Sequence, residues 1–170
     1  SQKILALLEN GAVVALLSDA GTPTISDPGW QLVDLARQSG HPIYAAPGPC
    51  AAILALSMSG FPCRRFSFEG FLPASGRHRR ETLDRLCSEE APIIFYESPH
   101  RLLKTLEEIS EIFTDRDLFV GRELTKKFEE CWRGPISQAH EVWKDRRVQG
   151  EFTLVVGPRP PKEDLPRAIP

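Results

Sequence analysis

The sequence predicts an α/β fold in which a mixed, mostly parallel sheet is flanked by helices. Short apolar runs alternate along the chain with stretches of amphipathic, helical spacing, and this alternation is typical of βαβ units. The run 12–17 is apolar without interruption, as expected for a strand buried on both faces. A length of 170 residues and a hydrophobic fraction of 41% fit one core, with or without a small appendage.

Residues that favour turns and helix caps define the expected helices and strands of the first half. Asn10 and Gly11 form a suitable helix C-cap, Asp27 and Pro28 a suitable N-cap and first helical residue, and Gly40 a helix end. We therefore expect a helix around 4–8, a strand over 12–17, a helix from 28 to about 39, a strand over 43–46 and a helix over 51–58.

The second half is expected to contain more strands. Alternating aromatic residues over 66–71 predict a half-exposed strand, and the shared face of Leu102, Leu106, Ile109 and Phe113 predicts a long helix that starts at Ser98. The other elements expected here are a helix over 77–86, strands over 93–96, 118–121 and 152–156, a helix over 136–143 and a linker or tail over 158–170.

Composition excludes several classes of protein. No apolar run approaches the roughly 18 residues of a membrane helix, and a net charge of −2 means that contact with a polyanion requires a local basic patch. The four cysteines form no C-x-x-C pair and have no histidine at finger spacing, so no metal site is expected. Because no secretory leader is recognised, free thiols in the reducing cytoplasm are expected.

Ligands of open α/β sheets bind beyond the carboxyl ends of strands, and four loops there hold polar residues: 18–29, 47–52, 97–101 and 121–126. Turn and helix capping is an alternative role for Asp19 and the favoured one for Asp27, and Glu97 and Glu123 would equally suit surface ion pairs with Arg101 and Arg122. The chain contains no G-x-G-x-x-G, no phosphate-binding P-loop and no nucleophile elbow.

Six sequence motifs, which overlap these four loops, point to a particular protein family. In order they are SDAGTP with SDPG (18–29), PGPCA (47–51), FEGFLP (68–73), FYESPHRLL (95–103), RELTK (122–126) and GEF (150–152). Together they resemble the tetrapyrrole methylase superfamily, and within it the methyltransferases of small-subunit ribosomal RNA. The resemblance implies a tetrapyrrole methylase-like fold and S-adenosylmethionine-dependent methylation of a cytidine ribose 2'-hydroxyl in 16S ribosomal RNA by a homodimer.

The same resemblance implies the domains and the cofactor residues. Residues 1–62 would be the remainder of an N-terminal domain and 63–157 the C-terminal domain, with the cofactor in the cleft between them. The sequence would correspond to the part of the family that follows its N-terminal strand and Gly-rich loop. Cofactor binding is assigned to Ser18, Asp19, Ala20, Gly21, Thr22 and Pro23 on the methionine side, Cys50 and Ala51 near the sulfonium, and Phe95, Tyr96, Phe152, Thr153 and Leu154 around the adenine.

A ribose hydroxyl loses its proton as it attacks, so a general base is expected, and Glu97, His100 and Glu123 remain open as candidates. RNA contact is expected from Arg64, Arg65, Arg77, Arg79 and Arg80, with His78, around the loop 71–73; the alternative is a solvated loop balanced by Glu81 and Asp84. Rival functions are a methylase of the same superfamily with another substrate, a non-catalytic RNA-binding or dimerisation module, and a small-molecule phosphate binder.

Overall fold

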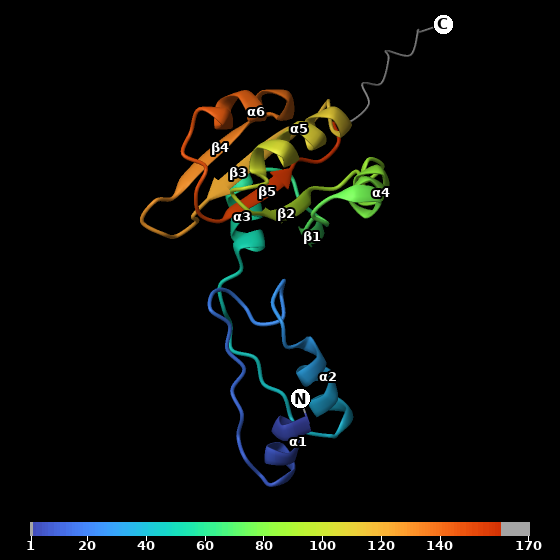
Figure 1. The fold of residues 1–170 in the computed structure, drawn as a ribbon, viewed down its shortest axis with the longest axis vertical. Helices are drawn as coiled ribbons and strands as arrows, with labels where there is room; N and C mark the ends of the chain where they lie inside the picture. The colour runs from blue at the N-terminus through green and yellow to red at the C-terminus, as the bar shows by residue number, and fades with distance from the viewer. Residues whose placement is uncertain (1, 161–170) are drawn as a thin grey trace, which may run out of the picture. The chain divides into compact units, whose positions relative to one another are not determined.

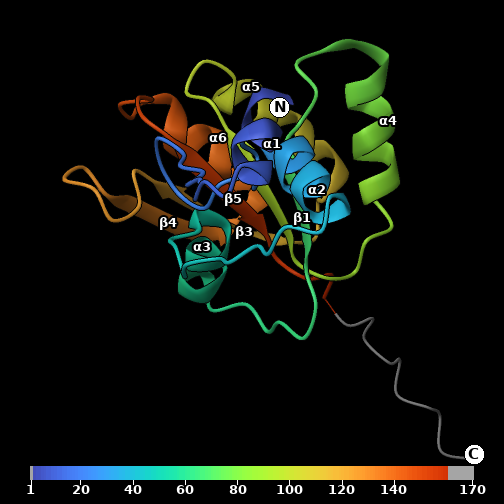
Figure 2. The same ribbon diagram turned by 90° about the horizontal axis from the view of Figure 1, so that it is seen from below.

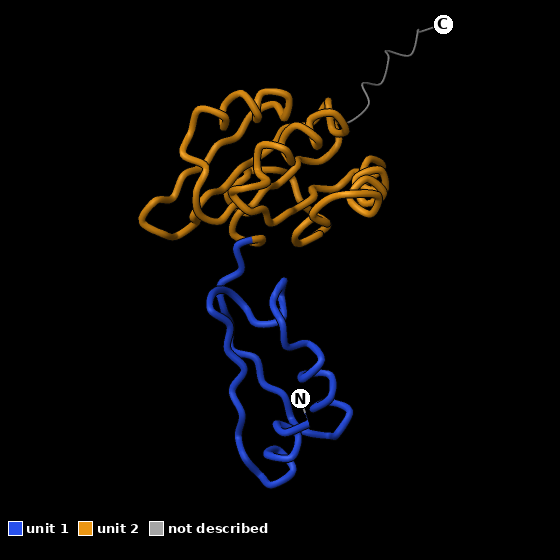
Figure 3. Tube along the Cα trace, viewed as in Figure 1, with its two compact units in different colours: residues 1–51 blue, residues 52–170 orange. Residues whose placement is uncertain are grey.

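The computed structural model describes residues 2–160, which divide into two compact units (Figure 3). Unit 1 covers residues 1–51 and unit 2 covers residues 52–170. Residues 161–170, which hold most of the expected tail, lie outside the described residues.

Unit 1 contains helices α1 (Gln2–Glu9) and α2 (Trp30–Gln38) joined by long loops. The expected strands over 12–17 and 43–46 are wrong, because neither segment pairs with a strand among the described residues and Leu17 is 84% exposed. An apolar run becomes a strand only where a neighbouring chain accepts its hydrogen bonds. The expected start of α2 is also wrong: the N-cap is Gly29, with φ 124°, in place of Asp27.

Unit 2 is built on a five-stranded sheet in the order β1-β2-β5-β3-β4 (Figure 1). The strands are β1 (Ser67–Phe71), β2 (Ile93–Glu97), β3 (Asp117–Arg122), β4 (Glu130–Pro135) and β5 (Phe152–Val156). This confirms the α/β class and the mixed sheet. The expected excess of parallel pairs is wrong, since β1–β2 is parallel and the three other described pairs are antiparallel.

The reason is the position of β5. This last strand enters between β2 and β3 and runs against both, so a strand that is buried on both faces has antiparallel neighbours. A continuous apolar run indicates that a strand is buried on both faces. It does not indicate whether the strand is parallel or antiparallel to its neighbours, so the sequence pattern could not distinguish these arrangements. Strand β4 was not predicted, because its segment ECWRGP mixes charged residues with Gly and Pro and forms a hairpin with β3.

Helices cover both faces of this sheet. Helices α5 (Leu102–Ile112) and α6 (Ile136–Lys144) pack together on one face, and α3 (Ala51–Ser59) lies on the other (Figure 2). The close-packed side of α3 consists of Ala52, Ala55 and Ser59, whose small side chains permit a short distance to the sheet. Helix α4 (Gly76–Leu86) runs beside β1 and α5.

Two further observations bear on the sequence-based expectations. No helix within residues 2–160 is long and apolar enough to cross a membrane. The four cysteines are free thiols; Cys63, Cys87 and Cys131 are exposed. Partial desolvation of the sulfur, followed by the neighbouring carboxylates of Glu129 and Glu130, raises the pKa of the Cys131 thiol although the residue is exposed.

Candidate active site and RNA-binding surface

The four motifs that fall within unit 2 meet at one edge of the sheet. The carboxyl ends of β1, β2 and β3 lie there with the start of β5, because Glu97 of β2 and Arg122 of β3 both pair with Phe152. Each of these residues belongs to a different motif of the sequence. The convergence makes this edge the candidate site in unit 2, in agreement with the general position of ligand sites in α/β sheets.

Glu97 lies at the centre of a buried polar network. Its Oε1 accepts a hydrogen bond from the Ser98 amide at 2.7 Å and forms an ion pair with Nη2 of Arg101 at 2.8 Å. Its Oε2 accepts the Thr105 hydroxyl at 2.7 Å. With its side chain fully buried and both oxygens engaged, this carboxylate acts as a structural acceptor.

The network extends to a second arginine and to the loop after β1. The guanidinium of Arg79 donates to Thr105 Oγ1 at 2.7 Å and to Glu108 Oε2 at 2.7 Å. Arg79 also donates to the carbonyl oxygen of Pro73 at 2.9 Å, and Arg101 donates to that of Leu72 at 3.0 Å. Two buried or half-buried arginines therefore hold consecutive carbonyl groups of this loop in place.

Arg79 was predicted to lie on the RNA-binding surface, but it is buried. The residue is 3% exposed and its guanidinium group donates to three protein acceptors, so its charge is already engaged within the protein. Arg77 and Arg80 are exposed at the start of the same helix, whereas Arg65 pairs with Glu89 beyond the amino end of β1. The predicted basic cluster is therefore divided between the two ends of β1 and has one member inside the protein.

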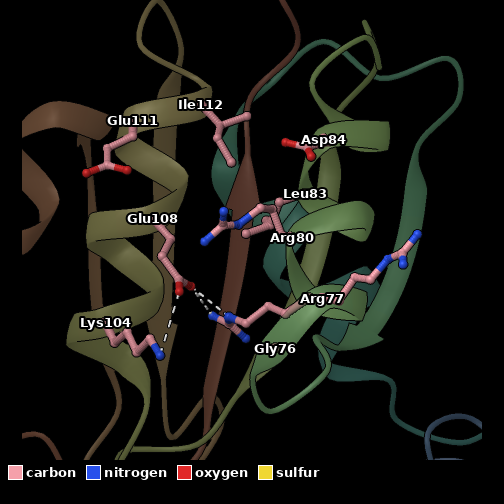
Figure 4. A pocket seen from close by; sticks show the side chains of 10 residues that line it. Gly76, Arg77, Arg80, Leu83, Asp84, Lys104, Glu108, Glu111 and Ile112 are labelled. Atoms are coloured by element: carbon pink, nitrogen blue, oxygen red, sulfur yellow. Dashed lines mark hydrogen bonds and ion pairs between the residues drawn. The ribbon is translucent and has the colours of Figure 1, made fainter.

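Arg80 and Arg77 differ in direction (Figure 4). Arg80 points into a groove of about 650 Å³ between α4 and α5, and Arg77 points away from it. The groove is lined by the basic residues Arg77, Arg79, Arg80 and Lys104 and by the acidic residues Asp84, Glu108 and Glu111. These mixed charges give the groove no clear preference for an anion. Arg80 and Arg64 form no ion pair with any residue in the described range 2–160, while Arg77 pairs with Glu81 at 2.5 Å.

A second cluster joins the motifs RELTK and GEF. Glu123 Oε1 accepts the Glu151 amide at 2.9 Å and Lys126 Nζ at 3.0 Å, and Lys126 also pairs with Glu151 Oε2 at 3.0 Å. The backbone hydrogen bond from Glu151, followed by the Lys126 ammonium, lowers the pKa of Glu123, and the two carboxylates raise the pKa of Lys126. We name these three residues the acid–lysine cluster.

The three candidate bases differ in availability. Glu97 is buried and Glu123 is held by two donors, whereas His100 is exposed in the turn between β2 and α5. The strand β5 separates the strand ends that carry Glu97 and Glu123, which corresponds to about 10 Å between their backbones. The structure therefore does not bring the two carboxylates together as a catalytic pair.

In unit 1 the two predicted cofactor loops touch. The Thr22 hydroxyl donates to the Pro49 carbonyl oxygen at 2.9 Å, and Ser18 donates to that of Gly21 at 3.2 Å. A Cβ at Gly48 would lie 3.1 Å from Thr22 Oγ1, so glycine permits this approach. Asp19, Ala20 and Gly21 are exposed, as is Ala51, and the side chain of Cys50 is half-buried.

Backbone strain is confined to the same regions. Four non-glycine residues within 2–160 have positive φ: Thr24, Ser26, Glu123 and Thr125. Two lie in the loop 18–29 and two in the motif RELTK. Such conformations persist only where surrounding contacts over-determine them, and they gather at functional sites.

The predicted adenine residues fall into two groups. Phe95, Phe152 and Leu154 belong to the core beneath α5 and α6, and each is at most 2% exposed. Their side chains are enclosed in the core, so their predicted contact with the adenine would have to use backbone atoms. Tyr96 and Thr153 alternate with them and lie on the other face, where the Tyr96 hydroxyl accepts the Ala52 amide of α3 at 3.2 Å.

Residues 2–160 contain no group of three or more His, Cys, Asp or Glu side chains that could hold a metal ion. Thr105, Glu108, Lys126 and Glu151 are part of the site networks but were not predicted. Lys126 and Glu151 lie within quoted motifs, so those motifs were a usable signal. Thr105 and Glu108 are placed by helix packing alone and left no signal in the sequence.

Comparison with known proteins identifies the family. A family described as Tetrapyrrole (Corrin/Porphyrin) Methylases matches residues 1–140. The chain belongs to this family. Three relatives, each named ribosomal RNA small subunit methyltransferase I, are similar to it. The relative from Thermotoga maritima is 46% identical over 91% of this chain, and those from Escherichia coli and Synechocystis are each 44% identical over 98%.

The tetrapyrrole methylase fold is also found among solved structures. A cobalt precorrin-4 methyltransferase superposes with a TM-score of 0.66 at 13% identity, covering 92% of this chain and 68% of that one. A uroporphyrin-III-C-methyltransferase from Thermus thermophilus gives 0.64 at 22% identity, with coverage of 92% and 69%. The chain spans between 59% and 69% of the length of the three curated relatives described above.

Proposed function

We propose that this chain takes part in S-adenosylmethionine-dependent methylation of small-subunit ribosomal RNA, at the 2'-hydroxyl of a cytidine ribose. The observation that carries the proposal is the identity of 44–46% to relatives named for this RNA over nearly the whole chain. Convergence of the unit 2 motifs on one sheet edge supports it.

The cofactor would be held by small residues and backbone groups. The Thr22 hydroxyl donates a hydrogen bond to the Pro49 carbonyl oxygen, Gly48 approaches Thr22 closely, and Asp19, Ala20 and Gly21 nearby are exposed. This chemistry fits the amino and carboxylate groups of a methionine tail. We assign Cys50 and Ala51 to the sulfonium region and, of the predicted adenine side chains, Tyr96, which is half-buried, whereas Thr153 is 4% exposed.

When bound, the cofactor supplies an activated methyl group to a ribose oxygen. The role left to the protein is to orient the ribose and to accept the hydroxyl proton. His100 suits the second task best, since its imidazole is exposed, whereas the Glu123 carboxylate is held by two donors and Glu97 is buried. Glu97 and Glu123 then act by holding the surrounding loops.

The first test measures cofactor binding. S-adenosylhomocysteine is titrated into the chain by calorimetry, with ATP as the control, and then into Asp19→Ala and Thr22→Val. We expect binding of S-adenosylhomocysteine alone, weakened about tenfold by each substitution, which is one lost contact of about 1.4 kcal/mol. Equal affinity for ATP would favour a phosphate binder instead.

The second test measures the reaction. Small-subunit ribosomal RNA is incubated with labelled cofactor and the protein, then digested to nucleosides. Label in 2'-O-methylcytidine is expected, with a loss of about a hundredfold or more in His100→Ala and a changed pH–rate profile. Label in another nucleoside contradicts the cytidine assignment. Binding of RNA without methyl transfer would support the non-catalytic alternative.

We also propose that two copies associate, as the resemblance implies, in the cytoplasm where ribosomes are made. Phe128 in the β3–β4 loop is 58% exposed and Trp132 on β4 is half-buried, so both are available to a partner. Sedimentation equilibrium over a hundredfold range of concentration tests the association. A monomer throughout would contradict it.

A further inference from the structure

We propose that Phe71 is a stacking platform for an unpaired nucleobase of the RNA substrate. The proposal rests on the proposed function, because it takes RNA as the ligand. Phe71 ends β1, at the sheet edge where the unit 2 motifs meet, and its side chain is 53% exposed although it belongs to the apolar motif FEGFLP.

The Phe71 ring is part of a cluster of packed aromatic rings. Its ring centroid lies 5.7 Å from that of Tyr96, and Tyr96 lies 5.0 Å from Phe68 in an edge-to-face arrangement. The Tyr96 hydroxyl is tied in turn to the first turn of α3 through the Ala52 amide. The exposed ring therefore rests on a series of packed rings and leaves part of its own surface open.

Hydrogen bonds also fix the backbone that follows Phe71. The next two carbonyl oxygens, those of Leu72 and Pro73, accept hydrogen bonds from Arg101 and Arg79, and Leu72 is buried. Both arginines are anchored by the buried Glu97–Thr105 pair. Preorganisation of this kind lowers the ordering cost of binding, which gives the buried network a positioning role.

Exposed basic side chains follow Phe71 along the chain, and one of them, Arg80, has no ion-pair partner within residues 2–160. Arg77, His78 and Arg80 are exposed on the first turns of α4, which begins five residues after Phe71, and the side chain of Lys104 on α5 is 62% exposed. Aromatic rings beside cationic side chains are the usual combination for single-stranded RNA, because the rings stack on bases and the cations meet phosphates.

The test uses fluorescence anisotropy with the 170-residue chain and a single-stranded RNA oligonucleotide that contains unpaired cytidines. Stacking on one base predicts a loss of about 5- to 150-fold in affinity for Phe71→Ala and a similar loss for Phe71→Leu, which keeps an apolar side chain without a ring. Phe71→Trp is expected to stay within about threefold. The salt dependence is expected to remain as in the parent chain, because no phosphate contact is removed.

Three controls separate the outcomes. Phe66→Ala removes an exposed phenylalanine at the other end of β1 and is expected to leave RNA affinity unchanged. Arg80→Ala is expected to lower the salt slope by about one unit without mimicking the ring variants. S-adenosylhomocysteine affinity is expected to change less than RNA affinity in Phe71→Ala, because Phe71 acts on the cofactor residue Tyr96 only through ring packing; a larger loss for the cofactor would assign the ring to it and overturn the proposal.

The result that overturns the proposal alone is RNA binding by the parent chain with equal affinity in all Phe71 variants. Failure of the parent chain to bind any RNA would instead overturn the proposed substrate class, and the stacking site with it. A protein partner in place of RNA would appear as this second outcome. Thermal unfolding of each variant verifies that the fold is intact.

Discussion

Arg79 lies between exposed neighbours on α4, yet it is buried. Neighbouring residues of a helix point in different directions around its axis. Arg79 therefore faces α5 and the loop at Pro73, while Arg77 faces solvent. A charged side chain inside a protein is tolerated only when it is paired with acceptors, and here Thr105, Glu108 and Pro73 each accept a hydrogen bond from the guanidinium.

Removal of Arg79 is therefore expected to be costly. Arg79→Ala leaves Glu108 and the Pro73 carbonyl without their main donor and is expected to lower the free energy of unfolding by about 3 kcal/mol or more. Arg77→Ala is the matched control; its ion pair with Glu81 is exposed, so a change within about 0.5 kcal/mol is expected. Urea denaturation of both variants measures the difference, and equal stability would contradict the buried role.

The shifted pKa values in the acid–lysine cluster predict that its contribution to stability depends on pH. The lowered pKa of Glu123 means that its contribution is present above the ordinary glutamate value of 4.5 and is lost as pH falls through the lower folded-state value. The raised pKa of Lys126 means that its contribution is present below 10.5 and is lost as pH rises through the higher folded-state value.

Glu123→Gln is accordingly expected to destabilise the chain by about 1 kcal/mol between about pH 5 and pH 10, and by less below this range as the parent carboxylate is protonated. Glu107→Gln, an exposed substitution on α5, serves as the control for a change of net charge. Denaturation curves at several pH values measure the effect. A difference between parent and Glu123→Gln that does not vary with pH would contradict the assignment.

At the scale of elements, α3 depends on its small side chains. Ala52, Ala55 and Ser59 face the sheet, and Ala55 is fully buried. An added branched side chain at this contact must displace helix or strand. The remaining side of α3 carries exposed Ile53 and Met58, so the apolar character of the helix does not by itself identify its buried side.

Ala55→Leu is therefore expected to destabilise the chain by about 1–3 kcal/mol through overpacking. Ser57→Leu places the same side chain on the exposed side of α3 and is expected to change the stability by at most about 0.5 kcal/mol. Thermal unfolding by circular dichroism compares the two. A larger loss in Ser57→Leu would show that the opposite side of α3 is the packed one.

At the scale of the whole molecule, the hydrophobic core lies almost entirely in unit 2. Of the buried apolar residues within 2–160, Ala36 alone belongs to unit 1. Burial of apolar area is the main favourable contribution to folding, so cooperative stability is expected to reside in the sheet of unit 2.

Hydrogen exchange followed by mass spectrometry tests this distribution in the 170-residue chain. Amides of 152–156 are expected to exchange at least about a thousandfold more slowly than those of 12–17 and 43–46, because the latter have no described strand partner. Peptides from α1 serve as an internal reference for helix fraying. Equal protection of 12–17 and 152–156 would mean that the apolar segments of unit 1 pair in solution.

Local patterns predicted a large part of this structure. Helix α3, strands β2 and β5 and helix α6 lie within a residue or two of their expected bounds, because periodicity and capping depend on neighbours in the chain. The motifs also identified the family and the loops of the candidate site. These properties were encoded by residue types at short spacing.

Only the tertiary structure decided the rest. The direction of β5, the pairing of β4, the unpaired state of 12–17 and the burial of Arg79 each depend on which distant segment lies alongside. Phe95, Phe152 and Leu154 likewise became core residues because α5 and α6 cover their face of the sheet. The physical reason is common to all of them: hydrogen-bond partners and burial come from residues far away in sequence, and no local pattern specifies those partners.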